Sequence, residues 1–126
     1  MKYNELTRRY FEQPAAYGVL SGPGTFRGAA GGRAQGAWVQ FDVQATGEPR
    51  VIGAASFLAF GCPHVIAAAA WLAEQAVGRR LEPVVPESVQ MLRARFDAPV
   101  EKLGRLLIVE DAWIAAMRAA MPVAAP

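Results

Sequence analysis

Cysteine and histidine are almost absent from this sequence, which has one of each among its 126 residues. A single cysteine excludes an internal disulfide. It also excludes a zinc or iron–sulfur site made of cysteines from one chain. An excess of one charge is missing too: the formal net charge is only +2, so we expect no nucleic-acid partner.

Long hydrophobic runs are also missing. The longest weakly polar run, Val65–Ala73, is far shorter than the roughly 20 apolar residues of a membrane-spanning helix. The N-terminal residues Met1–Arg9 are polar and lack the apolar core of a signal peptide. We therefore expect a cytoplasmic protein without a membrane partner, whose cysteine stays reduced.

Apolar material is abundant. Hydrophobic residues make up 53% of the chain and charged residues 19%, which is enough to build a core and argues against disorder. The length predicts a single domain over residues 1–126, with 122–126 as a frayed tail.

Hydrophobic periodicity, glycine and proline divide the chain into segments. Helices are predicted over 4–13, 63–77, 88–96 and 109–121, and strands over 37–43 and 51–60. The two strands, joined by a turn at 46–49, predict an antiparallel hairpin. Strands grouped before most of the helices favour an α+β fold, with a small antiparallel sheet and helices packed on one face.

Cys62 is the first candidate functional residue. It directly precedes Pro63, and proline is favoured at the first position of a helix, so we place Cys62 at the helix N-cap. Free backbone N–H groups and the helix dipole favour a thiolate there. Two interpretations stay open: a reactive thiol or metal ligand, and a small buried apolar residue at a tight turn.

His64 lies two residues further on and could join Cys62 in a metal site. Two ligands are too few, because zinc takes three or four from the protein. The others would have to come from Glu110, Asp111 or a second chain. The alternative is a solvent-facing or capping histidine. A Cys–His hydrolase lacks a third, orienting group.

The remaining motifs have structural explanations. The glycine-rich stretch 18–36 has room for a short, irregular strand, but its part 22–36 has no Gly-Lys-Ser/Thr ending, so we interpret that part as a mobile loop and not a phosphate loop. Arg79 and Arg80 follow a predicted helix and complement its dipole. Glu110 and Asp111 are placed at the start of the last helix, where acidic residues are favoured.

Three segments occur in a distinctive order along the chain. They are Tyr3-Asn4-Glu5 with Tyr10-Phe11-Glu12-Gln13-Pro14, then Phe57-Leu58-Ala59-Phe60-Gly61-Cys62-Pro63-His64-Val65-Ile66-Ala67, then Glu110-Asp111-Ala112-Trp113-Ile114. Together they resemble the iron–sulfur cluster assembly scaffolds, IscU and the N-terminal domain of NifU. The resemblance implies an IscU-like, three-stranded antiparallel sheet with helices, a scaffold and not an enzyme, iron or an iron–sulfur cluster as cargo, and a cysteine desulfurase or other assembly proteins as partners.

The resemblance also implies that the chain has lost most of the family's ligands. The family's other ligand positions carry Gln35 and Arg105 in place of cysteine, Ala37 in place of aspartate and Gly104 in place of histidine. Only Cys62 remains, and cluster irons take about four protein ligands in total. The chaperone-recognition segment of the family is kept only in part, at 98–102.

Three hypotheses follow. In the first, a scaffold-like protein handles sulfur or iron through Cys62, with His64 as a helper. In the second, a degenerate relative binds no metal and serves as a protein-interaction or regulatory module. In the third, a small enzyme uses Cys62 as its nucleophile.

Overall fold

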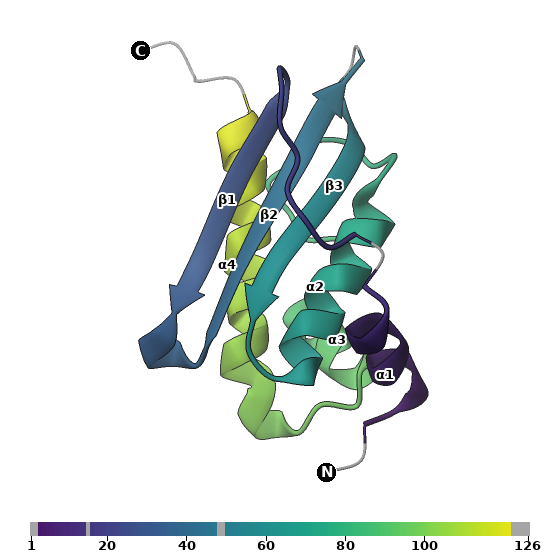
Figure 1. Ribbon diagram of the computed structural model, residues 1–126, viewed down its shortest axis with the longest axis vertical. Coiled ribbons are helices and arrows are strands. Elements are labelled where there is room, and N and C mark those ends of the chain that lie inside the picture. Colours follow the sequence, from purple (N-terminus) through teal and green to yellow (C-terminus); the bar gives the residue numbers. More distant parts are fainter. Residues whose placement is uncertain (1–2, 15, 48–49, 122–126) are drawn as a thin grey trace.

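The computed structural model describes residues 3–14, 16–47 and 50–121 (Figure 1). In chain order its elements are α1 (Glu5–Glu12), β1 (Thr25–Gly32), η1 (Arg33–Gln35), β2 (Ala37–Thr46), β3 (Val51–Phe60), α2 (Pro63–Ala76), α3 (Val89–Arg95), η2 (Val100–Lys102) and α4 (Leu103–Ala120). The predicted α+β class is confirmed. The predicted tail 122–126, and residues 48–49 of the predicted turn, lie outside the described residues.

The sheet has three antiparallel strands in the order β1-β2-β3. The predicted hairpin is its β2–β3 half, in a register that places Trp38 opposite Phe60 and Phe41 opposite Phe57. Alternate residues of β2 (Val39, Phe41, Val43) are completely buried and face the helices. This alternation is the period-two pattern of a strand with one face on the core.

Helices cover one face of the sheet, as expected. In Figure 1, α4 lies behind β1 and β2, while α2 lies behind β3 and carries α1 against it. The ring of Trp113 on α4 meets Phe41 on β2 edge to face, with centroids 5.1 Å apart. Both side chains are fully buried, and burial of each stabilises the fold by roughly 1.5–3 kcal/mol.

The interpretation of 22–36 as a mobile loop was wrong, because residues 25–32 form the full edge strand β1. Its glycines serve packing. A Cβ atom on Gly28 would lie 2.0 Å from the backbone nitrogen of Ala116, so α4 crosses this strand at backbone contact. A strand that lacks β-branched residues over most of its length is thus held by the helix packed on it, and local propensity gave little sign of it.

The segment before β1 runs across the other face of the sheet, in front of β2 and β3 in Figure 1. The amide of Gly18 donates to the carbonyl of Phe57 (2.9 Å), and the amide of Leu20 donates to the carboxylate of Asp42 (2.9 Å). Arg27 pairs with the same carboxylate at 2.7 Å, and Asp42 is only 1% exposed. This segment therefore buries a carboxylate on the face that the helices leave open.

The start of α3 and the end of α2 lie close to where the sequence predicts them. Ser88 caps α3 by accepting a hydrogen bond from the amide of Met91 (3.3 Å). Helix α2 ends at Ala76, shortly before Gly78, whose φ of +90° suits glycine. None of the helices in the described part of the chain is long and apolar enough to cross a membrane.

The last helix begins six residues earlier than predicted, at Leu103 and not at 109. It continues directly from the 3-10 turn η2, and its buried face already starts at Leu106. Glu110 and Asp111 therefore lie inside α4, so their predicted place at the start of a helix was wrong.

Candidate functional site

Three connections meet at the end of the sheet shown lowest in Figure 1: the β1–β2 turn, the β3–α2 turn and the start of α4. A Cβ atom on Gly61 would lie 3.3 Å from the Cβ of Ala37, which joins the first two. A Cβ atom on Gly36 would lie 3.1 Å from Nη2 of Arg105, which joins the first and the third. Packing of the Ala37 and Arg105 side chains against two glycines thus brings these segments together, although they are far apart in sequence.

Cys62 caps the N-terminus of α2, as predicted, with Pro63 at the start of the helix. Its carbonyl accepts hydrogen bonds from the amides of Val65 (3.0 Å) and Ile66 (3.2 Å), and its side chain makes no capping bond. The thiol is free and half-buried against the core. The sulfur therefore remains available at a helix end where negative charge is favoured.

His64 is buried, with 1% of its surface exposed, so the expectation of a solvent-facing or capping histidine was wrong. The imidazole lies edge-on to the ring of Tyr3, with centroids 5.0 Å apart. Within the described residues, its buried Nδ1 has no hydrogen-bond partner. Burial lowers the pKa of His64, the charge of Lys102 lowers it further, and Asp97 opposes the change. The side chain is therefore mainly neutral near pH 7.

The four other predicted site positions differ in their surroundings. Gln35 is exposed on the β1–β2 turn, and Ala37 is completely buried at the start of β2. Gly104 is exposed and has open space around it. Arg105 is half-buried, with its guanidinium over Gly36.

The acidic pair Glu110 and Asp111 does not complete a metal site here. Glu110 is seven residues along α4 from the start of the helix, about 10 Å at the rise of an α-helix. In residues 3–14, 16–47 and 50–121 no three His, Cys, Asp or Glu side chains are grouped closely enough to hold a metal ion.

Comparison with known proteins identifies the family of this chain. The family model for the NifU-like N terminal domain matches residues 2–119. The chain belongs to this family. The comparison with curated protein sequences gave no match.

The fold of this NifU-like domain also occurs in solved structures. One is described as a candidate iron–sulfur cluster assembly scaffold for the SUF system of the thermophile Fervidobacterium islandicum AW-1; it has a TM-score of 0.65 and 12% identity, with coverage of 91% of this chain and 96% of that one. Another, a hypothetical protein, has a TM-score of 0.63 and 15% identity, with coverage of 91% and 93%. At these identities the likeness shows the fold alone.

The donor set of this NifU-like domain does not fit an iron–sulfur cluster held by one chain. Beside the thiol of Cys62, the site end offers the amide of Gln35 and the guanidinium of Arg105. A guanidinium is always protonated and has no lone pair to offer a metal. About four protein ligands are needed, and these positions supply one thiolate.

Sequence reasoning missed the side chains around His64. Tyr3 was noted only as part of a motif. Lys102 belongs to the 98–102 segment and Asp97 directly precedes it. In the structure, the last three residues of that segment form η2. The one signal that could have pointed to Asp97 and Lys102 was their closeness in sequence to the site residues 104 and 105. It is too weak to identify a contact with α2.

Proposed function

We propose that this protein serves iron–sulfur cluster assembly by accepting sulfur at Cys62, without holding a [2Fe–2S] cluster on ligands of its own chain alone. One observation carries the proposal: the only cysteine of the sequence lies at the N-terminus of α2, at the end of the sheet where three connections meet. Membership of the NifU-like family supports the assembly role. The description of the SUF scaffold that shares this fold points the same way.

The proposed reaction is a transfer of sulfane sulfur from a cysteine desulfurase. The Cys62 thiol first loses its proton to solvent, and the thiolate attacks the terminal sulfur of the desulfurase persulfide. A new S–S bond forms on Cys62, the S–S bond of the donor breaks, and the donor cysteine leaves as a thiolate. The exchange is balanced without an outside oxidant or reductant. The N-terminus of α2 favours negative charge on both the attacking sulfur and the product persulfide.

The test is to incubate the full chain with an active cysteine desulfurase and free cysteine, followed by mass spectrometry of the intact protein. We expect the mass to rise by one sulfur atom in the wild type and not in Cys62→Ser. Gln35→Ala is the matched control, because it changes an exposed residue of the same end and keeps the thiol. An unmodified Cys62 beside a turning-over desulfurase would refute the proposal.

Anaerobic reconstitution with iron and sulfide tests the second half of the proposal. We expect the wild type to bind far less than one cluster per chain, because the site end offers one thiolate. A stoichiometric cluster on the monomeric wild-type chain that disappears in Cys62→Ser would overturn this half.

A second candidate function is partner binding without metal, as an interaction or regulatory module. It is favoured by an aromatic pair on the sheet face opposite the helices: Trp38 and Phe60 stack with centroids 6.2 Å apart, and Phe60 is 43% exposed. Aromatic side chains of this kind are enriched at protein interfaces. If this is the function, Trp38→Ala with Phe60→Ala abolishes capture of the desulfurase, while Cys62→Ser leaves capture unchanged and neither changes bound metal.

A further inference from the structure

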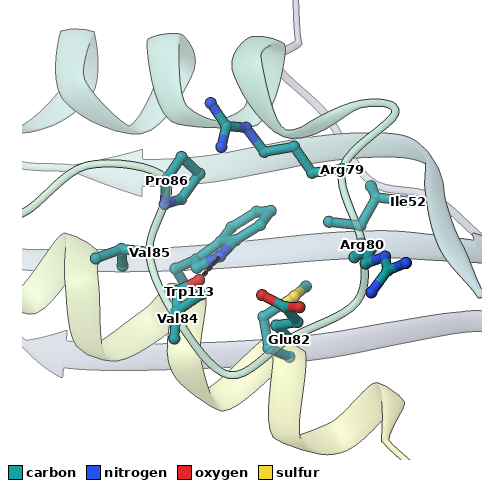
Figure 2. A pocket seen from close by; sticks show the side chains of 9 residues that line it. Ile52, Arg79, Arg80, Glu82, Val84, Val85, Pro86 and Trp113 are labelled. Atoms are coloured by element: carbon teal, nitrogen blue, oxygen red, sulfur yellow. Dashed lines mark hydrogen bonds between the residues drawn. The ribbon is translucent and has the colours of Figure 1, made fainter.

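A small pocket lies at the other end of β3 from Cys62 (Figure 2). Its walls come from the start of β3, the connection between α2 and α3, and the helix α4, and its volume is about 200 Å³. The apolar lining consists of Ile52, Trp113 and Met117, none of which is more than 1% exposed, and of the more exposed Val84, Val85 and Pro86. The pocket thus reaches side chains of the core.

Backbone hydrogen bonds hold the pocket in shape. The amide of Ile52 donates to the carbonyl of Arg79 (2.9 Å), and the amide of Gly78 donates back to the carbonyl of Ile52 (2.8 Å). On the far side, the indole N–H of Trp113 donates to the carbonyl of Val84 (3.2 Å), as the dashed line in Figure 2 shows. A pocket built this way needs little ordering when a ligand binds, which favours affinity.

The rim carries charges of both signs. Arg79, Arg80 and Glu82 line the pocket, and Figure 2 shows the two arginines and the glutamate around the indole of Trp113. Arg79 uses its Nε to donate to the carbonyl of Gln75 (3.1 Å), which holds its guanidinium at the end of α2. In the part of the chain that the structure describes, no ion pair joins Glu82 to either arginine.

We propose that this pocket binds a free α-amino acid with an apolar side chain of about the size of leucine. The carboxylate would pair with the guanidinium group of Arg80 and the ammonium group with Glu82, while the side chain would lie against the apolar lining residues Val84, Val85 and Pro86. The volume is below the roughly 300–1,000 Å³ of pockets for drug-sized molecules, which suits a ligand of about ten heavy atoms. The proposal is independent of sulfur chemistry at Cys62.

Titration of the full, 15N-labelled chain with L-leucine tests the proposal by NMR. The probe is the indole N–H signal of Trp113, distinguished from the other two indoles with the variants Trp38→Phe and Trp71→Phe. We expect a saturable shift with a Kd on the order of 1 mM, typical of so small a ligand. N-acetylleucine lacks the ammonium charge and leucinamide lacks the carboxylate, so each is expected to bind about tenfold more weakly.

Variants of the rim complete the test. Arg80→Gln and Glu82→Gln change side chains of the rim and are each expected to weaken leucine binding by about five- to tenfold. Arg8→Gln, at an exposed position of α1, is the matched control and is expected to bind leucine like the wild type. The absence of a saturable shift up to about 20 mM would overturn the proposal. Equal binding of N-acetylleucine, or wild-type affinity in both rim variants, would overturn it as well.

Discussion

Arg105 on α4 holds its guanidinium against Gly36 of the β1–β2 turn: a Cβ atom on Gly36 would lie only 3.1 Å from Nη2 and 3.4 Å from Cζ. Positions 36 and 105 are therefore neighbours in space, although 69 residues separate them in sequence. Gln35 adjoins the contact. The sequence resemblance implies cluster cysteines at positions 35 and 105, so we expect Arg105 to place a cation where a scaffold of this kind has a thiolate.

The first prediction is that ligands can be restored at this end. The double variant Gln35→Cys, Arg105→Cys adds two thiolates next to the Gly36 contact and removes the guanidinium, so that this end of the sheet carries three thiolates, Cys62 included. After anaerobic reconstitution we expect the double variant to bind clearly more iron and sulfide than the wild type, measured by metal and sulfide analysis.

The same variant with Cys62→Ser is the control and is expected to lose most of this iron. A folded double variant that binds no more iron than the wild type would mean that these three positions do not share one site.

The second prediction concerns the contact between β1 and α4. Gly28→Ala places a Cβ atom 2.0 Å from the backbone nitrogen of Ala116, so α4 has to move away from the sheet. We expect a loss of about 3 kcal/mol in the free energy of unfolding, measured by urea denaturation.

Gly104→Ala is the matched control, since nothing lies within 4 Å of the added atom and the residue belongs to α4. Its expected effect is a gain of about 0.5 kcal/mol from reduced entropy of the unfolded chain. Equal stability of the two variants would contradict the backbone contact.

The third prediction concerns the buried carboxylate on the open face. Asp42→Ala leaves the amide of Leu20 and the guanidinium of Arg27 without their acceptor. We expect destabilisation by about 2–3 kcal/mol. Gln40→Ala changes the neighbouring position on the same face of β2 and is expected to stay within about 0.5 kcal/mol of the wild type.

Urea denaturation of both variants gives the comparison. An effect of Asp42→Ala no larger than that of Gln40→Ala would show that the crossing segment does not depend on this carboxylate.

The fourth prediction is a pH dependence that comes from His64. Because burial holds the pKa of His64 below its ordinary value of 6.5, the unfolded chain takes up a proton more readily than the folded one. The free energy of unfolding is therefore not reduced by His64 above about pH 6.5. It falls as the pH is lowered through that value toward the pKa of His64 in the folded protein. Over one pH unit this loss cannot exceed about 1.4 kcal/mol.

The comparison is urea denaturation at pH 7.5 and pH 5.5 for the wild type and His64→Phe, which keeps an aromatic ring beside Tyr3. We expect the wild type to lose more stability than the variant on acidification. The same pH dependence in both proteins would assign it to other groups.

Much of the fold could be predicted from short-range patterns. The β-branched and aromatic residues of β2 predicted the hairpin, and Cys62 followed by Pro63 predicted the start of α2. The edge strand β1 was predicted from the residues only as a short, irregular strand within 18–36, because its glycines are poor strand formers and Gly28 instead allows contact with the backbone of α4. The start of the last helix was missed because the acidic pair Glu110 and Asp111 imitates a helix N-terminus.

For the candidate site, the sequence by itself determined the chemistry that is available: one thiol, predicted at the N-terminus of a helix, and non-ligating residues at Ala37, Gly104 and Arg105 with the amide of Gln35. Only the tertiary structure decided that Arg105 covers Gly36, that His64 is buried against Tyr3, and that a charged rim surrounds the pocket at Trp113. The physical reason is the distance along the chain over which each kind of interaction acts. Backbone propensity and capping act over a few residues, whereas burial and neighbouring charge depend on segments that meet only when the sheet and its helices pack together.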